Sequence, residues 1–308
     1  MGKILLFYKY VAIENPQEVA DWQRSICTSL GIKGRIIVAT EGINVTVGGP
    51  VAAVESYKKT LEAHPLFSNI DFKESKGDER YFPRLRIMIK KEIVRLGIDP
   101  AELSATEAAP YVSPQEAHEI MSNPPENLVI LDTRNDYEIA VGTFNNAVNP
   151  NTRYFKEFPQ YIDDNLNLFK DKQVLMVCTG GVRCERASAY LKRKDVAEKV
   201  MHIQGGIHRY VEQFPNGHFR GSNYVFDARI TQPINNDILS NCSICLTPTD
   251  FYVNCNNAEC NKQFLCCAPC EKELQEACSR ECFTLVKEKK VIIRTKPARV
   301  NHNRDLHV

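Results

Sequence analysis

A cysteine that could act as a nucleophile stands at the end of an apolar run in the middle of the chain. Val174–Val177 leads directly into Cys178, and two glycines and Arg183 follow closely. A parallel strand would place Cys178 at its carboxyl end, where open α/β sheets bind their ligands. Glycine N–H groups, the N-terminus of a following helix and the arginine all favour a thiolate over a thiol. We therefore predict a catalytic cysteine with a lowered pKa rather than a buried structural one.

The residues next to this cysteine suggest separate roles. Arg183 is expected to stabilise the sulfur anion or to bind a phosphate. Cys184 falls in the first turn of the predicted helix, where it could resolve an oxidised Cys178 or pack as a small residue. The spacing does not decide between these two roles of Cys184. The predicted active-site loop consists of Thr179, Gly180, Gly181 and Val182.

Nine of the twelve cysteines fall between Cys242 and Cys282. Eight of them follow the pattern C-x2-C-x9-C-x4-C-x6-C-x2-C-x7-C-x3-C, which suits two structural Zn²⁺ ions bound by four thiolates each. One arrangement is interleaved, with the first pair joined to the third and the second to the fourth; Cys266, adjacent to Cys267, is left out. Disulfides and an iron–sulfur cluster are disfavoured, because neither a secretory signal nor a C-x2-C-x2-C run is present. The predicted ligands are Cys242, Cys245, Cys255, Cys260, Cys267, Cys270, Cys278 and Cys282.

The elements that must position these cysteines begin with an α+β unit over residues 1–96. Strand-like and helix-like patterns alternate there in the order β-α-β-β-α-β, which is typical of a ferredoxin-like or acylphosphatase-like sandwich. Glu41-Gly42 marks the turn of a hairpin within it. The expected strands are 4–8, 34–38, 44–47, 70–72 and 85–89, and the expected helices are 17–30 and 51–64.

The rest of the chain divides into a second α/β unit and a cysteine-rich module. Continuous apolar strands alternating with helices predict a parallel sheet, with strands at 128–131, 173–177 and 199–203 and a helix at 183–194. Residues 221–241 are interpreted as a polar connection. The expected organisation is therefore a linker at 97–110, a parallel α/β domain at 111–220, a zinc-binding module at 221–286 and a basic tail at 287–308.

The composition excludes collagen-like, mucin-like and wholly disordered proteins. A hydrophobic content of 43% and a charged content of 25% are typical of a globular chain, and 308 residues favour two or three domains. No apolar run is long enough to span a membrane, and the first residues lack a signal-peptide cleavage site, so we expect a cytoplasmic protein. The net charge of +1 divides into −4 for residues 1–286 and +5 for the tail. That tail could bind phosphates or be a plain solvated end.

Four sequence features together resemble a rhodanese domain. They are Asp132-Thr-Arg-Asn-Asp-Tyr-Glu138, Gly142, Cys178-Thr-Gly-Gly-Val-Arg183 and Gly205-Gly206. The resemblance implies a loop cysteine that carries a persulfide cradled by backbone amides. Phosphatases of the related cysteine-loop type need five residues between cysteine and arginine, whereas four separate Cys178 from Arg183. Phosphatase chemistry is therefore disfavoured.

A narrower resemblance covers nearly the whole chain. Gly34-Arg-Ile-Ile-Val-Ala-Thr-Glu-Gly-Ile-Asn44 and Cys178-Thr-Gly-Gly-Val-Arg-Cys-Glu-Arg-Ala-Ser188 are similar to segments of the bacterial tRNA uridine hydroxylases; Val182 stands where that family often has isoleucine. The family combines an acylphosphatase-like domain, a rhodanese domain and often a cysteine-rich extension. The resemblance implies oxygen-dependent conversion of the wobble uridine of certain tRNAs to 5-hydroxyuridine. It also implies that Cys178 is the nucleophile or persulfide carrier.

Several basic residues could bind tRNA phosphates around a uridine flipped out of its stack. Lys192–Lys194 end a predicted helix, where cations also suit the helix dipole, so a solvated helix face explains them as well. Arg134 could frame the mouth of the pocket or form a modest ion pair with Glu138. The predicted substrate-binding residues are Arg134, Arg186, Lys192, Arg193 and Lys194, with Arg35, Arg84 and Arg86 as further candidates near the amino-terminal hairpin.

The sequence leaves two other functions open. A persulfide sulfurtransferase would use the same Cys178 loop and would need neither oxygen nor the additional domains. A zinc-containing adaptor for RNA or protein would leave the loop idle, which its intact cysteine, glycines and arginine disfavour. Because the sequence carries no recognisable flavin, haem or facial-triad signature, one hypothesis for hydroxylation is addition of the Cys178 thiolate to C6 of uracil.

Overall fold

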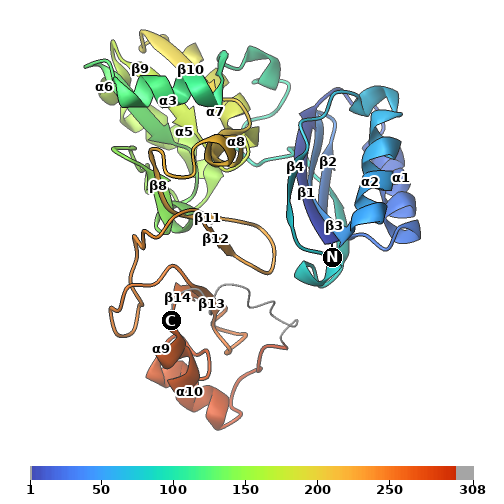
Figure 1. Cartoon of the computed structure of the whole chain (residues 1–308), viewed down its shortest axis with the longest axis vertical. Helices are drawn as coiled ribbons and strands as arrows, with labels where there is room; N and C mark the ends of the chain where they lie inside the picture. Colours follow the sequence, from blue (N-terminus) through green and yellow to red (C-terminus); the bar gives the residue numbers. More distant parts are fainter. Residues whose placement is uncertain (1, 296–308) are drawn as a thin grey trace. The chain divides into compact units, whose positions relative to one another are not determined.

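The computed structural model of the chain describes residues 2–295 (Figure 1). The chain forms two compact units. Of the described residues, one unit contains 2–137 together with 144–218, and the other contains 138–143 and 219–295. The end of the predicted basic tail, residues 296–308, lies outside the described residues. No helix in the described part of the chain is both long and apolar enough to cross a membrane.

The amino-terminal part of the first unit is a five-stranded sheet with two helices on one face (Figure 1). The strand order β4-β1-β3-β2-β5 contains the ferredoxin-like order that the sequence predicted, with one further strand beside β2. Leu5 and Phe7 point into the helix-covered core, so Leu6 and Tyr8 belong to the opposite face. The elements are β1 (Gly2–Tyr10), α1 (Pro16–Ser29), β2 (Lys33–Ala39), β3 (Gly42–Pro50), α2 (Val51–Glu62), η1 (Pro65–Phe67), β4 (Lys73–Lys76), η2 (Glu79–Tyr81) and β5 (Leu85–Ile89).

One strand of this sheet lies later in the sequence than predicted. Residues 70–72 were expected to be extended, but Phe72 N–H bonds back to the carbonyl of Ile70 in a tight turn. Both side chains pack on the core from outside the sheet. The strand is β4 instead, where Lys73 pairs opposite Leu6. The short apolar pattern of residues 70–72 therefore correctly predicted contact with the core, but it was wrong about which residues pair in the strand.

The remainder of the first unit is built on a four-stranded sheet of order β6-β10-β9-β7. Its registered strand pairs are parallel, as the continuous apolar runs predicted. Each predicted strand is present within a residue of its expected bounds. The elements are β6 (Tyr111–Val112), α3 (Pro114–Ser122), β7 (Leu128–Asp132), α4 (Asp136–Ile139), η4 (Phe155–Glu157), α5 (Phe158–Asp164), α6 (Leu166–Phe169), β9 (Gln173–Val177), α7 (Val182–Arg193), β10 (Lys199–Ile203) and α8 (Gly206–Gln213).

The segment predicted to be a linker is packed into the core of this α/β domain. Leu103 and Ala109 are buried there, and the short helix η3 (Ala105–Glu107) lies against α7. The buried guanidinium of Arg186 donates to the carbonyl oxygens of Ile98 (2.6 Å) and Leu103 (3.2 Å). Arg186 also pairs with the Glu92 carboxylate at 2.6 Å, so the residues just before this segment are attached to α7 as well.

The second unit holds a small sheet and the cysteine-rich module. The stretch 221–241, predicted to be a polar connection, instead carries most of β11 (Phe219–Tyr224) and all of β12 (Thr231–Pro233), which join β8 (Gly142–Phe144) in a sheet of order β12-β11-β8. Polar Ser222 and Asn223 are buried in β11, and Ser222 donates a hydrogen bond to Asp250, which explains why hydrophobicity alone missed this strand. The module itself contains β13 (Tyr252–Asn254), β14 (Gln263–Leu265), α9 (Ala268–Glu273) and α10 (Arg280–Lys287).

Candidate active site and cysteine clusters

The Cys178 loop joins the carboxyl end of β9 to the N-terminus of α7, as the sequence predicted. Gly181 donates its backbone N–H to the Cys178 sulfur at 3.1 Å. Gly181 has a φ of 103°, and a Cβ on it would lie 2.8 Å from the hydroxyl oxygen of Tyr8. Glycine is needed here for the backbone conformation and for the close approach of a neighbouring side chain. The loop therefore closes around the sulfur.

The N-terminus of α8 donates backbone hydrogen bonds to the Cys178 loop. Ile207 N–H donates to the carbonyl of Cys178 at 2.9 Å, and His208 N–H donates to the carbonyl of Thr179 at 3.0 Å. A Cβ on Gly206 would approach that Cys178 carbonyl oxygen to 2.4 Å, so a larger residue would push the loop away from α8. Gly206 thus allows the close contact between α8 and the cysteine loop.

Two fully buried cysteines show how the loop changes the chemistry of its sulfur. Burial raises the pKa of Cys27, in the core of the amino-terminal sheet, to about 12. Burial also opposes the Cys178 thiolate, but a hydrogen bond from Cys184, the charge of Arg183 and backbone N–H groups outweigh it. The pKa of Cys178 consequently lies well below its ordinary value, which is the condition for a nucleophile at neutral pH.

The residues predicted to assist Cys178 lie next to it. Burial and the neighbouring Cys178 thiolate raise the pKa of Cys184 well above its ordinary value, so Cys184 stays a thiol that donates to the thiolate. Arg183 is nearly buried, and its guanidinium donates to the Thr179 hydroxyl at 3.1 Å across the loop. Cys178 and Cys184 therefore combine one sulfur anion with one protonated sulfur.

The amino-terminal sheet supplies residues to this site that sequence reasoning did not identify. The Tyr8 hydroxyl donates to the Glu185 carboxylate at 2.7 Å, and the Tyr10 hydroxyl donates to the carbonyl of Val182 at 3.2 Å. The Tyr111 hydroxyl donates to the same Glu185 carboxylate. Burial raises the pKa of Glu185. These tyrosines could have been found from the alternation of residues along β1, which places Tyr8 and Tyr10 on the face away from the helices.

A buried lysine from the same sheet adds a cation to the site. Only 2% of the Lys73 side chain is exposed, and its ammonium pairs with the Asp71 carboxylate at 2.7 Å. Burial lowers the pKa of Lys73, while Asp71 and the Cys178 thiolate act in the opposite direction. Asp71 also accepts from Arg209 of α8 at 3.1 Å, which connects the sheet to the helix beneath the loop.

Cys178 has no solvent-exposed surface in this conformation. Leu6 lies against Gly180, Tyr8 lies against Gly181, and the Tyr8–Glu185 hydrogen bond closes the arrangement. A macromolecular substrate can reach the sulfur only after side chains of the amino-terminal sheet move away from the loop. In this conformation the Cys178 sulfur, whose pKa is lowered, is thus enclosed by the loop and the amino-terminal sheet.

The predicted substrate-binding residues of the α/β domain are not brought together on one open surface. Arg134 is fully buried and pairs with Asp132 at 2.6 Å, and Arg186 is equally buried. The Lys192 ammonium donates to backbone carbonyls, Arg193 pairs with Glu107 at 2.6 Å, and Lys194 pairs with Asp163 at 2.5 Å. These cations already have internal partners, so their role in binding RNA stays a prediction.

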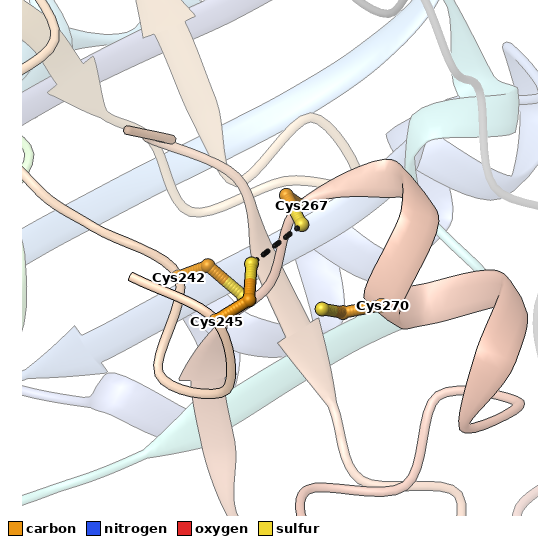
Figure 2. Close-up of side chains that lie close together, drawn as sticks. All are labelled: Cys242, Cys245, Cys267 and Cys270. Atoms are coloured by element: carbon orange, nitrogen blue, oxygen red, sulfur yellow. Dashed lines mark hydrogen bonds between the residues drawn. The ribbon is translucent and has the colours of Figure 1, made fainter. Parts of the chain in front are cut away.

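The eight cysteines of the carboxyl-terminal module form two separate groups of four. In the first group, two cysteines come from the loop before β13 and two from the start of α9, and their sulfurs converge (Figure 2). The Cys245 and Cys267 sulfurs are 3.5 Å apart. All four sulfur atoms lie within 4.8 Å of one another. The members of this group are Cys242, Cys245, Cys267 and Cys270.

The second group has the same character. Its Cys278 sulfur lies 3.7 Å from Cys260 and 3.8 Å from Cys282. The grouping is the interleaved arrangement that the spacing suggested, and each group could hold a metal ion. Cys266 is buried beside the first group but belongs to neither. The members of the second group are Cys255, Cys260, Cys278 and Cys282.

Family models match three consecutive parts of the chain. The UPF0176 acylphosphatase like domain matches residues 2–93, the Rhodanese-like domain matches 113–213 and the Rhodanase C-terminal model matches 220–283. Together with the Cys178 loop, these matches define a protein of the rhodanese-containing class with an acylphosphatase-like domain and a cysteine-rich extension.

Relatives that align with 91% of this chain identify the family within that class. A tRNA uridine(34) hydroxylase of Onion yellows phytoplasma is 39% identical over 284 residues, which cover 91% of each chain. Proteins of the same name from Bacillus mycoides and Streptococcus suis are 38% and 39% identical, over 91% of this chain and 88% of theirs. This chain belongs to the tRNA uridine(34) hydroxylase family.

Proposed function

We propose that this protein hydroxylates the wobble uridine of tRNA at C5, with molecular oxygen as the co-substrate and Cys178 as the catalytic residue. The thiolate-favouring environment of Cys178 carries the proposal, because an ordinary buried cysteine such as Cys27 has a raised pKa. Similarity over 91% of the chain to proteins named tRNA uridine(34) hydroxylase supports the substrate and the reaction class. We also propose a cytoplasmic location, which the proposed tRNA substrate supports.

The Cys178 thiolate would activate the base by adding to C6 of uracil. This addition converts C5 into an enolate-type carbon, which attacks oxygen to give a C5 hydroperoxide, and departure of Cys178 with loss of the C5 proton restores the ring. The freed thiolate then takes the outer oxygen atom as a sulfenic acid and leaves 5-hydroxyuridine. Arg183, beside the loop, is placed to stabilise the sulfur anion or a uracil carbonyl.

Cys184 would complete the redox balance. Its thiol condenses with the Cys178 sulfenic acid to form a disulfide and water. The sum is then uridine, oxygen and two thiols giving 5-hydroxyuridine, a disulfide and water, and a cellular dithiol must reduce the disulfide before the next cycle. In Cys184→Ala, a sulfenic acid should persist on Cys178 and react with dimedone; packing alone would produce no such trapped species.

A persulfide sulfurtransferase is the second candidate. The Gly181 N–H that points at the Cys178 sulfur could cradle a persulfide in the same loop. This function would leave the uracil of tRNA unchanged and would need a sulfur donor. Sulfide release from the purified protein after treatment with a reductant would support it, provided that the Cys178→Ala variant releases none from this site.

The two cysteine groups would hold structural zinc. Four thiolates around Zn²⁺ at a bond length of about 2.3 Å lie about 3.8 Å apart in a tetrahedron. Sulfur separations of 3.5, 3.7 and 3.8 Å in the two groups fit that arrangement. The metal would stabilise a module whose apolar core consists largely of cysteines.

Nucleoside mass spectrometry tests the proposed function. Cells that lack the protein are complemented with wild type, Cys178→Ala or Cys27→Ala, the last being a matched buried cysteine outside the site. Wild type and Cys27→Ala should restore 5-hydroxyuridine and its derivatives in tRNA, and Cys178→Ala should not. Restoration by Cys178→Ala would refute the catalytic role of the cysteine. An unchanged nucleoside profile in the deletion strain, with no second enzyme present, would refute the hydroxylase function.

A further inference from the structure

Four exposed cations form a compact strip on the amino-terminal sheet. Parallel pairing of β2 with β5 places Arg35 directly beside Arg86. Lys33 is the first residue of β2, and Arg84 directly precedes β5. Alternation along β2 and β5 directs Lys33, Arg35 and Arg86 to the face opposite α1 and α2. All four residues are exposed. We call Lys33, Arg35, Arg84 and Arg86 the basic strip.

The charges of the basic strip are clustered and are not neutralised by carboxylates. Within residues 2–295, no carboxylate pairs with any of its four side chains. Lys58, on the helix side of the same sheet, pairs with Glu74, and Arg193 of α7 pairs with Glu107. Clustered like charges repel one another and create a local positive potential, which a polyanion relieves.

The basic strip lies on the same sheet face as the residues that close the active site. One row across the sheet runs from Leu6 through Thr46 and Arg35 to Arg86, each residue opposite the next. At about 4.8 Å between neighbouring strands, Arg35 lies about 10 Å from Leu6 along this row. Leu6 in turn contacts the loop glycine Gly180. An extended ligand on the strip would therefore lead towards Cys178.

We propose that the basic strip binds the phosphate backbone of the RNA substrate and guides its target nucleotide to the Cys178 loop. The proposal rests on the proposed function for the identity of the RNA. Charge complementarity selects a polyanion, and three of the four cations are arginines, whose planar guanidinium groups bind phosphate oxygens in pairs. An RNA is favoured over an acidic protein because this face leads to the loop that carries the activated cysteine.

The salt dependence of tRNA binding tests the strip directly. The affinity of an unmodified tRNA transcript is measured at several salt concentrations for wild type, for Arg35→Ala/Arg86→Ala and for Arg24→Ala/Lys59→Ala. Arg24 and Lys59 are exposed cations on α1 and α2, so the control removes the same charge from the other side of the sheet. The strip variant should bind more weakly, and the slope of log K against log salt should fall by about 1 per residue removed. The control variant should keep the wild-type slope.

Further measurements separate the alternatives. Arg35→Lys/Arg86→Lys keeps the charge and should recover most of the slope, which excludes misfolding of the alanine variant as the cause. Equal affinity and slope for wild type and the alanine variant would overturn the proposal. Loss of polyglutamate binding with tRNA affinity unchanged would overturn it in favour of a protein-binding surface.

The binding assay also distinguishes this inference from the proposed function, because it needs no turnover. If wild type hydroxylates tRNA while the strip variant binds as wild type does, only the inference fails. If tRNA carries no 5-hydroxyuridine dependent on this protein but the strip variant still loses tRNA affinity, the strip is an RNA-binding surface and the hydroxylase function fails. Absence of tRNA binding by wild type would overturn both.

Discussion

The cysteines of the Cys178 loop and of the carboxyl-terminal module have different surroundings. A single sulfur in the loop receives backbone N–H groups, a thiol hydrogen bond and a nearby guanidinium, which lower its pKa. Four sulfurs in each module group face one another instead, at the separations expected around one metal ion. The comparison shows that reactivity follows from what surrounds a thiolate: fixed donors leave it available for attack, whereas a metal would occupy its electron pairs.

The largest expected effect comes from removing one metal ligand. Cys255→Ser should reduce the bound zinc from two ions per chain to one, because a structural site of this kind needs all four thiolates. Binding of structural Zn²⁺ contributes about 10–16 kcal/mol to folding of small metal domains, so the module should lose its fold around α10. Metal analysis and limited proteolysis measure the two effects.

Cys266→Ala is the control for that experiment, since Cys266 is buried in the module outside both groups. It should retain two zinc ions and resist proteolysis as wild type does. The comparison between the two regions would break down if Cys255→Ser kept both metal ions.

Removal of the Cys184 thiol should change the pH dependence of catalysis. Cys184→Ala deletes the hydrogen bond that stabilises the Cys178 thiolate, so the pKa of Cys178 rises. A hydrogen bond to a charged group contributes about 1.5–3 kcal/mol, which corresponds to about 1–2 pH units. Because the thiolate form exists above the pKa, the acid limb of the single-turnover rate should move to higher pH. An unshifted limb in Cys184→Ala, with Cys27→Ala as reference, would contradict this account.

Loss of the Tyr8 hydroxyl should open the closed site. Tyr8→Phe removes the 2.7 Å hydrogen bond to Glu185 and leaves the ring in place. We expect alkylation of Cys178 by iodoacetamide, followed by peptide mass spectrometry, to be about tenfold faster, in line with about 1.5 kcal/mol for a hydrogen bond to a carboxylate. Tyr190→Phe, which loses a bond to surface Asp163, should leave the alkylation rate unchanged. Equal rates in all three proteins would show that this bond does not keep the site closed.

The smallest effect is expected from the exposed charges at the end of α7. Arg193→Ala breaks only a surface ion pair with Glu107, and such pairs contribute little in water. The melting temperature and Cys178 reactivity should remain close to wild type, and tRNA affinity should change by less than about twofold. A larger loss of affinity than in the basic-strip variant would make α7 the main phosphate contact.

Prediction from sequence succeeded where local pattern and structure coincide. The strands of the α/β domain are long apolar runs, and the run that ends at Cys178 placed both β9 and the following loop correctly. The predictions were wrong where the buried residues of a strand are polar, or where a strand pairs with residues far away in the sequence. Ser222 and Asn223 lie buried in a strand that looked like a connection, and the pairing of Lys73 with Leu6 moved β4 past the apolar residues expected to form it.

The cysteine groups and the active site also differ in how much their sequence revealed. Metal ligands come in short pairs whose spacing is visible, and the grouping followed the spacing. Tyr8 and Lys73 reach the site from far away in the chain, and neither forms a motif with Cys178. The cations at the end of α7 looked available in sequence, whereas their partners, Glu107 and Asp163, are brought to them only by folding.

The sequence by itself therefore predicted which cysteine has a lowered pKa, which cysteines can share a metal and which family the chain resembles, because these depend on residues close together in the chain. Only the tertiary structure decided that the Cys178 site is closed by the amino-terminal sheet and which cations remain unpaired. Burial and charge neutralisation depend on distant segments meeting in space, and strand register sets which side chains meet. That register places Arg35 beside Arg86 on the face that leads to Cys178.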